Sequence, residues 1–107
     1  MNVQWRPQLG SEVFTGHETS VRRLSDTRRG DRGVVIQVSP EGMTSVDADE
    51  REELERRLLE IGFVEGARIE LLHEGFLGRD PIAVRLDDMR VALRRREAQG
   101  VLVRLDR

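Results

Sequence analysis

The sequence contains no cysteine, no lysine and no tyrosine, and it has only one tryptophan and three phenylalanines among its 107 residues. Without cysteine, the chain can form neither a disulfide framework nor a cysteine-ligated zinc site. The lack of lysine makes all 18 cationic side chains arginines. This bias more often reflects a GC-rich genome than chemistry that is specific to the guanidinium group.

Long hydrophobic runs are missing as well. No segment approaches the roughly 20 apolar residues of a membrane-spanning helix. The N-terminal stretch MNVQWRPQLGSEVF has no unbroken apolar segment of about 7 to 15 residues behind a basic start, which a signal peptide would require. We therefore expect a soluble, intracellular protein that does not insert into a membrane.

Charge is abundant but balanced in sign. Charged residues make up 36% of the chain, and 20 acidic against 18 basic side chains leave a formal net charge of -2. Neither sign dominates enough to predict nucleic acid or a membrane surface as the partner. The length fits one small domain. Residues 1–20 show no sustained hydrophobic period, so we expect an N-terminal extension there and the domain over residues 21–107.

One α-helix is expected over residues 48–61. Asp47 can cap its first turn, and Glu50, three residues later, can reach back to the cap as in a capping box. Apolar side chains recur at helical spacing along this segment, namely Leu54, Leu58 and Ile61, with Leu59 widening the stripe. Gly62 follows at the position where a left-handed residue ends a helix. One face of the helix is therefore expected to be buried.

The rest of the domain shows the period of two that is typical of β-strands. Apolar and polar residues alternate, or β-branched residues cluster, in five short segments: residues 34–38, 67–72, 81–86, 90–94 and 101–105. Crossover helices for a parallel sheet are missing. About five strands with one inserted helix therefore predict a mainly β fold, a small closed or nearly closed barrel.

Three stretches of the chain together resemble the FeoA family of small ferrous iron transport accessory proteins. They are LSDTRRGDRGVVIQV, RRLLEIGFVEGARIELL and LGRDPIAVRLDDMRVALRRREAQGVLV, and the resemblance runs from about Val21 to Arg104. It implies an SH3-like β-barrel in the cytoplasm that acts by protein–protein contact with the cytoplasmic part of FeoB, the ferrous iron transporter with a GTP-hydrolysing domain. The same module also occurs as the C-terminal domain of metal-dependent repressors.

The segment GFLGRDP contains two glycines and a cation, but it does not fit a phosphate-binding P-loop. It has no lysine, serine or threonine, and a strand rather than a helix follows it. We interpret it as a loop between strands, in which Gly75 and Gly78 take positive φ angles and Pro81 opens the next strand. Phe76 and Leu77 then lie at the tip. They either fold back over the mouth of the barrel, which we favour, or face a partner.

Neither a metal site nor a catalytic site is expected. The two histidines are His17, in the extension, and His73, which neighbours Glu74 in a strand and so points to the opposite face. Serine and threonine residues have no credible histidine partner, and Asp87 and Asp88 are expected to be solvated. We therefore interpret the protein as non-enzymatic, with no cofactor.

Seven residues are candidates for contact with the partner. Together they would form a contact surface with an apolar centre and a charged rim. They are Leu59, Phe63 and Val64 where the helix meets the barrel, Phe76 and Leu77 in the loop, and Arg94 and Arg95 at the rim. For Leu59 and Phe63, packing in the core is the favoured alternative.

Two other functions stay open at this stage. The first is an SH3-like peptide-binding or regulatory module, related to the repressor domains, that could also bind the chain's own WRP motif. The second is a nucleic-acid-binding barrel that uses Arg94–Arg96. It is less favoured, because the aromatic residues needed for base stacking lie far from this run. The sequence also leaves a homo-oligomer open.

Overall fold

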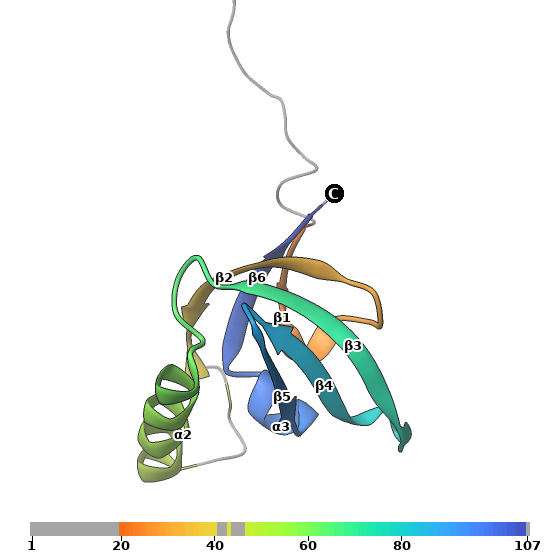
Figure 1. Ribbon diagram of the computed structural model, residues 1–107. Helices are drawn as coiled ribbons and strands as arrows, with labels where there is room; N and C mark the ends of the chain where they lie inside the picture. The colour runs from red at the N-terminus through yellow and green to blue at the C-terminus, as the bar shows by residue number, and fades with distance from the viewer. Residues whose placement is uncertain (1–19, 41–42, 44–46, 107) are drawn as a thin grey trace, which may run out of the picture.

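The computed structural model describes residues 20–40, 43 and 47–106 (Figure 1). The elements follow in the order β1 (Val21–Arg23), the 3₁₀ turn η1 (Leu24–Asp26), β2 (Arg32–Val38), α2 (Ala48–Ile61), β3 (Arg68–Leu77), β4 (Asp80–Leu86), β5 (Met89–Leu93), α3 (Arg95–Ala98) and β6 (Val101–Leu105). The extension expected for residues 1–20 lies, apart from Ser20, outside the described residues.

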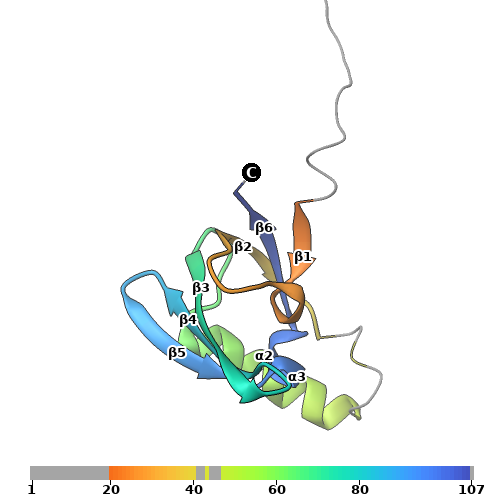
Figure 2. The same ribbon diagram turned by 90° about the vertical axis from the view of Figure 1, so that its right-hand side faces the viewer.

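The six strands form one antiparallel sheet with the order β1-β6-β2-β3-β4-β5. The sheet is strongly curved, and α2 and α3 lie below its concave side (Figures 1 and 2). The predicted mainly β fold with one inserted helix is confirmed, with one strand more than expected. The additional strand is β1, whose three residues are too few for an alternating pattern to be recognised.

Helix α2 has the bounds and caps that the sequence predicts. The Asp47 carboxylate accepts a hydrogen bond from the Glu50 N–H at 2.8 Å, and the Glu50 carboxylate accepts one from the Asp47 N–H at 3.3 Å. Gly62 has a φ of 126°, and its N–H donates to the Leu58 carbonyl at 3.2 Å. The helix therefore ends at Gly62, where a side chain would disfavour this backbone conformation.

The core lies between the curved sheet and the two helices. Its fully buried side chains come from nearly every element and include Leu24, Val35, Leu58, Phe63, Leu71, Ile82, Val84, Leu86, Val101 and Val103. Leu54 and Ile61 of the predicted helical stripe are partly buried and pack against this cluster. The buried face of α2 thus fixes the helix against the sheet.

The two glycines of the GFLGRDP segment have different roles. The interpretation of this segment as a connection between strands with a positive φ at Gly78 is confirmed, whereas the positive φ expected at Gly75 is wrong. Gly78 (φ 66°) and Arg79 (φ 60°) form a two-residue turn between the paired Leu77 and Asp80, which is the geometry of a tight hairpin. Gly75 lies within β3 and does not have a positive φ. A Cβ atom there would lie 2.1 Å from the Asp80 carbonyl oxygen, so this position needs glycine because two backbones approach closely.

Candidate partner-binding surface

Three exposed apolar side chains gather where α2 ends. Leu59 is 43% exposed, Val64 49% and Met89 47%. The Gly62 N–H donates to the Leu59 carbonyl at 3.1 Å, and the Val64 N–H donates to the Gly62 carbonyl at 2.8 Å. A Cβ atom on Gly62 would lie 3.9 Å from the Met89 Cε. We call Leu59, Val64 and Met89 the Gly62 patch.

The sequence identified two members of the Gly62 patch and missed the third. Leu59 was named as a candidate for partner contact, with packing in the core as the favoured alternative. That alternative is wrong, because Leu59 projects from the edge of the stripe that buries Leu58. The strand expected over residues 90–94 did not include Met89, which is the first residue of β5. The signal that could have placed Met89 in the strand is its spacing of two from Val91, because residues at this spacing lie on the same face of a strand.

The two candidate phenylalanines lie in opposite environments. Phe63 has no exposed surface and belongs to the core, in agreement with the favoured alternative, so its ring cannot contact a partner while the domain is folded. Phe76 is fully exposed, at 106% of its reference area. The expectation that it folds back over the barrel is therefore wrong. The Leu77 side chain lies outside the described part, so its proposed role stays a prediction.

The arginine run splits into side chains with different surroundings. Arg94 is exposed, as a rim residue should be. Arg95 is only 15% exposed, and the expectation that it lies at a solvated rim is wrong. Its guanidinium donates to the Ser25 carbonyl at 2.6 Å, to the Arg79 carbonyl at 2.8 Å and to the Glu74 carboxylate at 2.7 Å. Arg95 therefore holds η1, the β3–β4 hairpin and α3 together.

Glu74 is the acidic centre of this arginine cluster. The Arg29 N–H donates to its Oε2 at 3.1 Å. This hydrogen bond holds the pKa of Glu74 below its ordinary value, and the positive charges of Arg95, Arg79 and Arg28 act in the same direction, while desolvation opposes them. Glu74 is consequently ionised near neutral pH and forms charge-assisted contacts with the loops around it.

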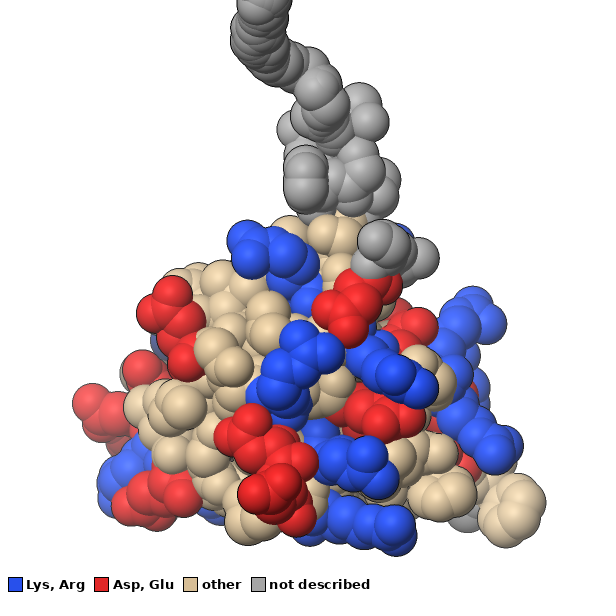
Figure 3. Space-filling model, turned by 45° about the horizontal axis from the view of Figure 1, so that its top comes forward, with Lys and Arg blue, Asp and Glu red and all other residues tan. Residues whose placement is uncertain are grey.

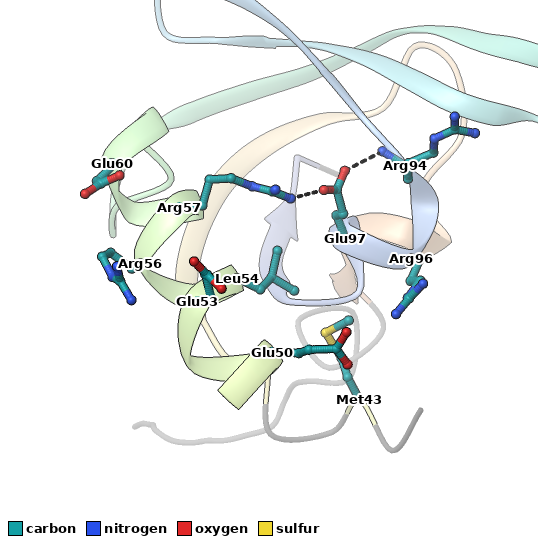
Figure 4. Close-up of a pocket in the computed structure, with 10 residues that line it drawn as sticks. All are labelled: Met43, Glu50, Glu53, Leu54, Arg56, Arg57, Glu60, Arg94, Arg96 and Glu97. Atoms are coloured by element: carbon teal, nitrogen blue, oxygen red, sulfur yellow. Dashed lines mark hydrogen bonds and ion pairs between the residues drawn. The ribbon is translucent and has the colours of Figure 1, made fainter. Parts of the chain in front are cut away.

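A groove of about 510 Å³ lies between α2 and α3. It is lined by Met43, Glu50, Glu53, Leu54, Arg56, Arg57, Glu60, Arg94, Arg96 and Glu97. Figure 4 shows Leu54 pointing into the groove and an ion pair between Arg57 and Glu97 across it. Glu97 also accepts a hydrogen bond from the Arg94 N–H at 2.9 Å. Charges of both signs therefore alternate around an apolar floor.

Charges of both signs are also interspersed over the face shown in Figure 3, with more arginine toward its right-hand side.

In the described part of the chain, no three histidine, aspartate or glutamate side chains lie close enough together to hold a metal ion. Among the described helices, none combines the length and the apolar character needed to cross a membrane.

A curved antiparallel sheet of six strands with one inserted helix is the architecture of a small SH3-like domain. Residues 22–105 match the FeoA domain family. The chain therefore belongs to the FeoA family, as the sequence resemblance indicated.

Three comparisons place the chain among known proteins. It is 35% identical over 83 residues to the Fe(2+) transport protein A/Fe(2+) transporter FeoB fusion protein of Porphyromonas gingivalis, covering 78% of this chain but only 8% of that relative. The crystal structure of Stenotrophomonas maltophilia FeoA complexed with zinc, described as a procaryotic SH3 domain protein, is 34% identical with a TM-score of 0.58, over 75% of this chain and 86% of that one. A manganese-dependent transcriptional repressor is 26% identical with a TM-score of 0.64, over 80% of this chain and 42% of that one.

Proposed function

We propose that this protein is a non-enzymatic accessory protein of ferrous iron uptake, which binds the cytoplasmic part of a FeoB-type transporter. The observation that carries the proposal is the Porphyromonas gingivalis relative, in which a segment similar to this chain forms one polypeptide with FeoB. Fusion of two domains in one relative favours contact between their counterparts. In this proposal residues 21–107 form the binding domain in the cytoplasm, and residues 1–20 are an extension to it.

The Gly62 patch is the part of the described surface that best fits a contact of this kind. Leu59, Val64 and Met89 each lie near Gly62, and each has more than two fifths of its area in solvent. Exposed charged residues adjoin them in the sequence, among them Glu60, Glu65, Asp88 and Arg90. An apolar centre with a polar rim is the usual anatomy of a protein interface.

The test replaces Val64 and Phe76 separately by aspartate and measures binding to the purified cytoplasmic domain of the transporter by titration calorimetry. We expect Val64→Asp to weaken binding by at least about tenfold, since it places a charge in the centre of the contact. Phe76→Asp is the matched control, because its ring is also exposed but lies in the hairpin of β3 and β4. Both variants should unfold at the wild-type temperature.

Loss of binding with Phe76→Asp alone would contradict the choice of surface and would move the contact to the hairpin tip. Wild-type protein that shows no binding at transporter concentrations of about 1 mM, where even weak contacts are occupied, would contradict the proposed function itself.

A second function is supported by the likeness to the manganese-dependent repressor. A regulatory module of that kind would bind a peptide segment in place of the transporter. Amide chemical shifts that respond to the chain's own residues 1–20 as a peptide, but not to the transporter domain, would favour it. The nucleic-acid alternative loses support, because the Arg95 side chain is mostly buried within the fold. Only Arg94 and Arg96 of the three arginines are exposed.

A further inference from the structure

Strand β5 is one edge of the sheet, and among the described strands it pairs with β4 alone. The register of this pair sets Leu86 opposite Met89 and Val84 opposite Val91. In Figure 2 the hairpin of β4 and β5 forms the left-hand margin of the molecule. Most proteins protect such an edge, because its unpaired backbone groups can add another strand.

The register of the hairpin determines which backbone groups of β5 point outward. Leu86 and Met89 flank a two-residue link, so they form a hydrogen-bonded pair, and the hydrogen-bonded positions then alternate along the strand. The N–H and C=O groups of Arg90 and Ala92 consequently point away from β4. Among the described residues, no backbone group bonds to them, and both residues are exposed.

We propose that β5 pairs with β5 of a second copy of this chain, in an antiparallel, two-fold symmetric contact. The sheet then continues through both copies. In such a contact, Arg90 and Ala92 must face residues of the second copy whose backbone N–H and C=O groups also point outward. Three registers satisfy this requirement, with Arg90, Val91 or Ala92 on the two-fold axis. This inference concerns self-association and does not rest on the proposed contact with a transporter.

The charges of the edge select one of the three registers. An axis at Arg90 would set Arg90 opposite itself, and an axis at Ala92 would set Arg90 opposite Arg94 of the second copy. Like charges directly opposite one another destabilise a strand pair. An axis at Val91 sets Arg90 opposite Ala92 in both halves, so this register contains no like-charge pair.

The same register also creates attraction at both ends of the strand. With the axis at Val91, Asp88 faces Arg94 of the second copy, and symmetry repeats this pair at the other end. Both residues are exposed in the single chain, and Arg94 retains an extended backbone with a ψ of 146°. Met89, with 47% of its area exposed, faces Leu93 of the second copy and becomes covered. The edge is thus complementary to itself in charge and in apolar contact.

Sedimentation velocity on the full chain, over a range of concentrations, measures the association. The contact is short, so we expect a reversible dimer with a dissociation constant on the order of 100 μM. Asp88→Arg and Arg94→Glu each replace two attractive pairs by two repulsive ones. Each variant alone should raise the dissociation constant by at least about tenfold.

Mixing the two variants gives the sharper result. In the mixed dimer, Arg94 of one copy faces Asp88 of the other, and the introduced arginine faces the introduced glutamate. We therefore expect a mixture of Asp88→Arg and Arg94→Glu to associate as wild type does, although neither variant does so alone. A mixture that stays monomeric while wild type associates would overturn the register.

A backbone control tests the strand pairing itself. Ala92→Pro removes an outward N–H without removing a bond to β4, and proline is tolerated on an edge strand; it should abolish association. Ala92→Thr keeps the N–H at the same exposed site and should retain it. Circular dichroism melting of both variants establishes that they fold. Unchanged association of Ala92→Pro, or wild type that is monomeric at about 1 mM, would overturn the proposal.

Discussion

Phe63 and Phe76 show at the scale of single residues how similar local sequences reach opposite environments. Each follows a glycine. The Phe63 N–H donates to the Leu58 carbonyl at 3.1 Å, so the turn at Gly62 directs its ring into the core. Phe76 lies near the end of β3, beside an irregularity in the pairing with β4, and its ring is in solvent. The identity of the neighbouring residue therefore does not decide burial.

The two rings should differ sharply in their contribution to stability. Phe63→Ala leaves a cavity in a close-packed core, and we expect it to lower the free energy of unfolding by about 3 to 5 kcal/mol. Phe76→Ala removes no buried contact and should change this free energy by less than about 0.5 kcal/mol. Urea unfolding followed by circular dichroism measures both. Equal losses for the two variants would contradict the burial described for them.

At the scale of elements, the β3–β4 hairpin depends on two glycines for unrelated reasons. Gly78 has a φ of 66° and permits the turn. Gly75 allows the backbone of β3 to approach the Asp80 carbonyl of β4, where a Cβ atom would come within 2.1 Å. A conformational requirement can be satisfied by a residue other than glycine, whereas a contact of this kind between two backbones cannot.

The same substitution at both glycines separates the two reasons. Gly78→Asn should leave the free energy of unfolding within about 0.5 kcal/mol of wild type, because asparagine tolerates a positive φ in a tight turn. Gly75→Asn forces the strands apart and should cost about 1 to 3 kcal/mol, as overpacking does. Thermal unfolding of the two variants under identical conditions provides the comparison, and a larger loss at Gly78 would reverse our assignment.

At the scale of the whole molecule, the contacts of Arg95 join segments that are far apart in the sequence. Its guanidinium reaches Ser25, 70 residues away, and Glu74, 21 residues away. Both Arg95 and Glu74 have less than a fifth of their side-chain area exposed. Partly buried, charge-assisted hydrogen bonds of this type contribute more than exposed ion pairs. The cluster therefore holds η1 and the hairpin in their relative positions.

The cluster should make stability depend on pH on the acidic side. The pKa of Glu74 is lowered in the folded protein from its ordinary value of 4.5. A lowered pKa contributes stability that is fully present above 4.5 and is lost as the pH falls through the folded value. Glu74→Gln should therefore be less stable than wild type at neutral pH, and the difference should shrink below the ordinary glutamate value.

Melting temperatures measured from neutral pH to about pH 3 test this dependence. Glu65→Gln, which removes a carboxylate from an exposed site, serves as the matched control for the loss of one negative charge. A constant difference between Glu74→Gln and wild type across the range would show that the contribution of Glu74 does not arise from its charge.

Some of the fold and part of the candidate site could be read from short segments. The bounds of α2, its cap at Asp47 and its end at Gly62 were predicted correctly, because capping and left-handed backbone angles depend on residues within one turn. The Gly62 patch was found in part, through Leu59 and Val64. The Arg95 side chain was wrongly expected at the solvated rim, because its hydrogen-bond partners come from distant segments and no local sequence pattern indicates them.

By itself the sequence determined the family, the mainly β fold with one helix, and the charge pattern of each strand. The tertiary structure alone decided which side chains reach solvent: Phe63 is inside, Leu59, Phe76 and Met89 are outside, and β5 is left as an open edge. Local sterics and hydrogen bonding set the first group of features. The second depends on which elements pack against each other across the chain, so only the folded arrangement reveals the surfaces available to a partner.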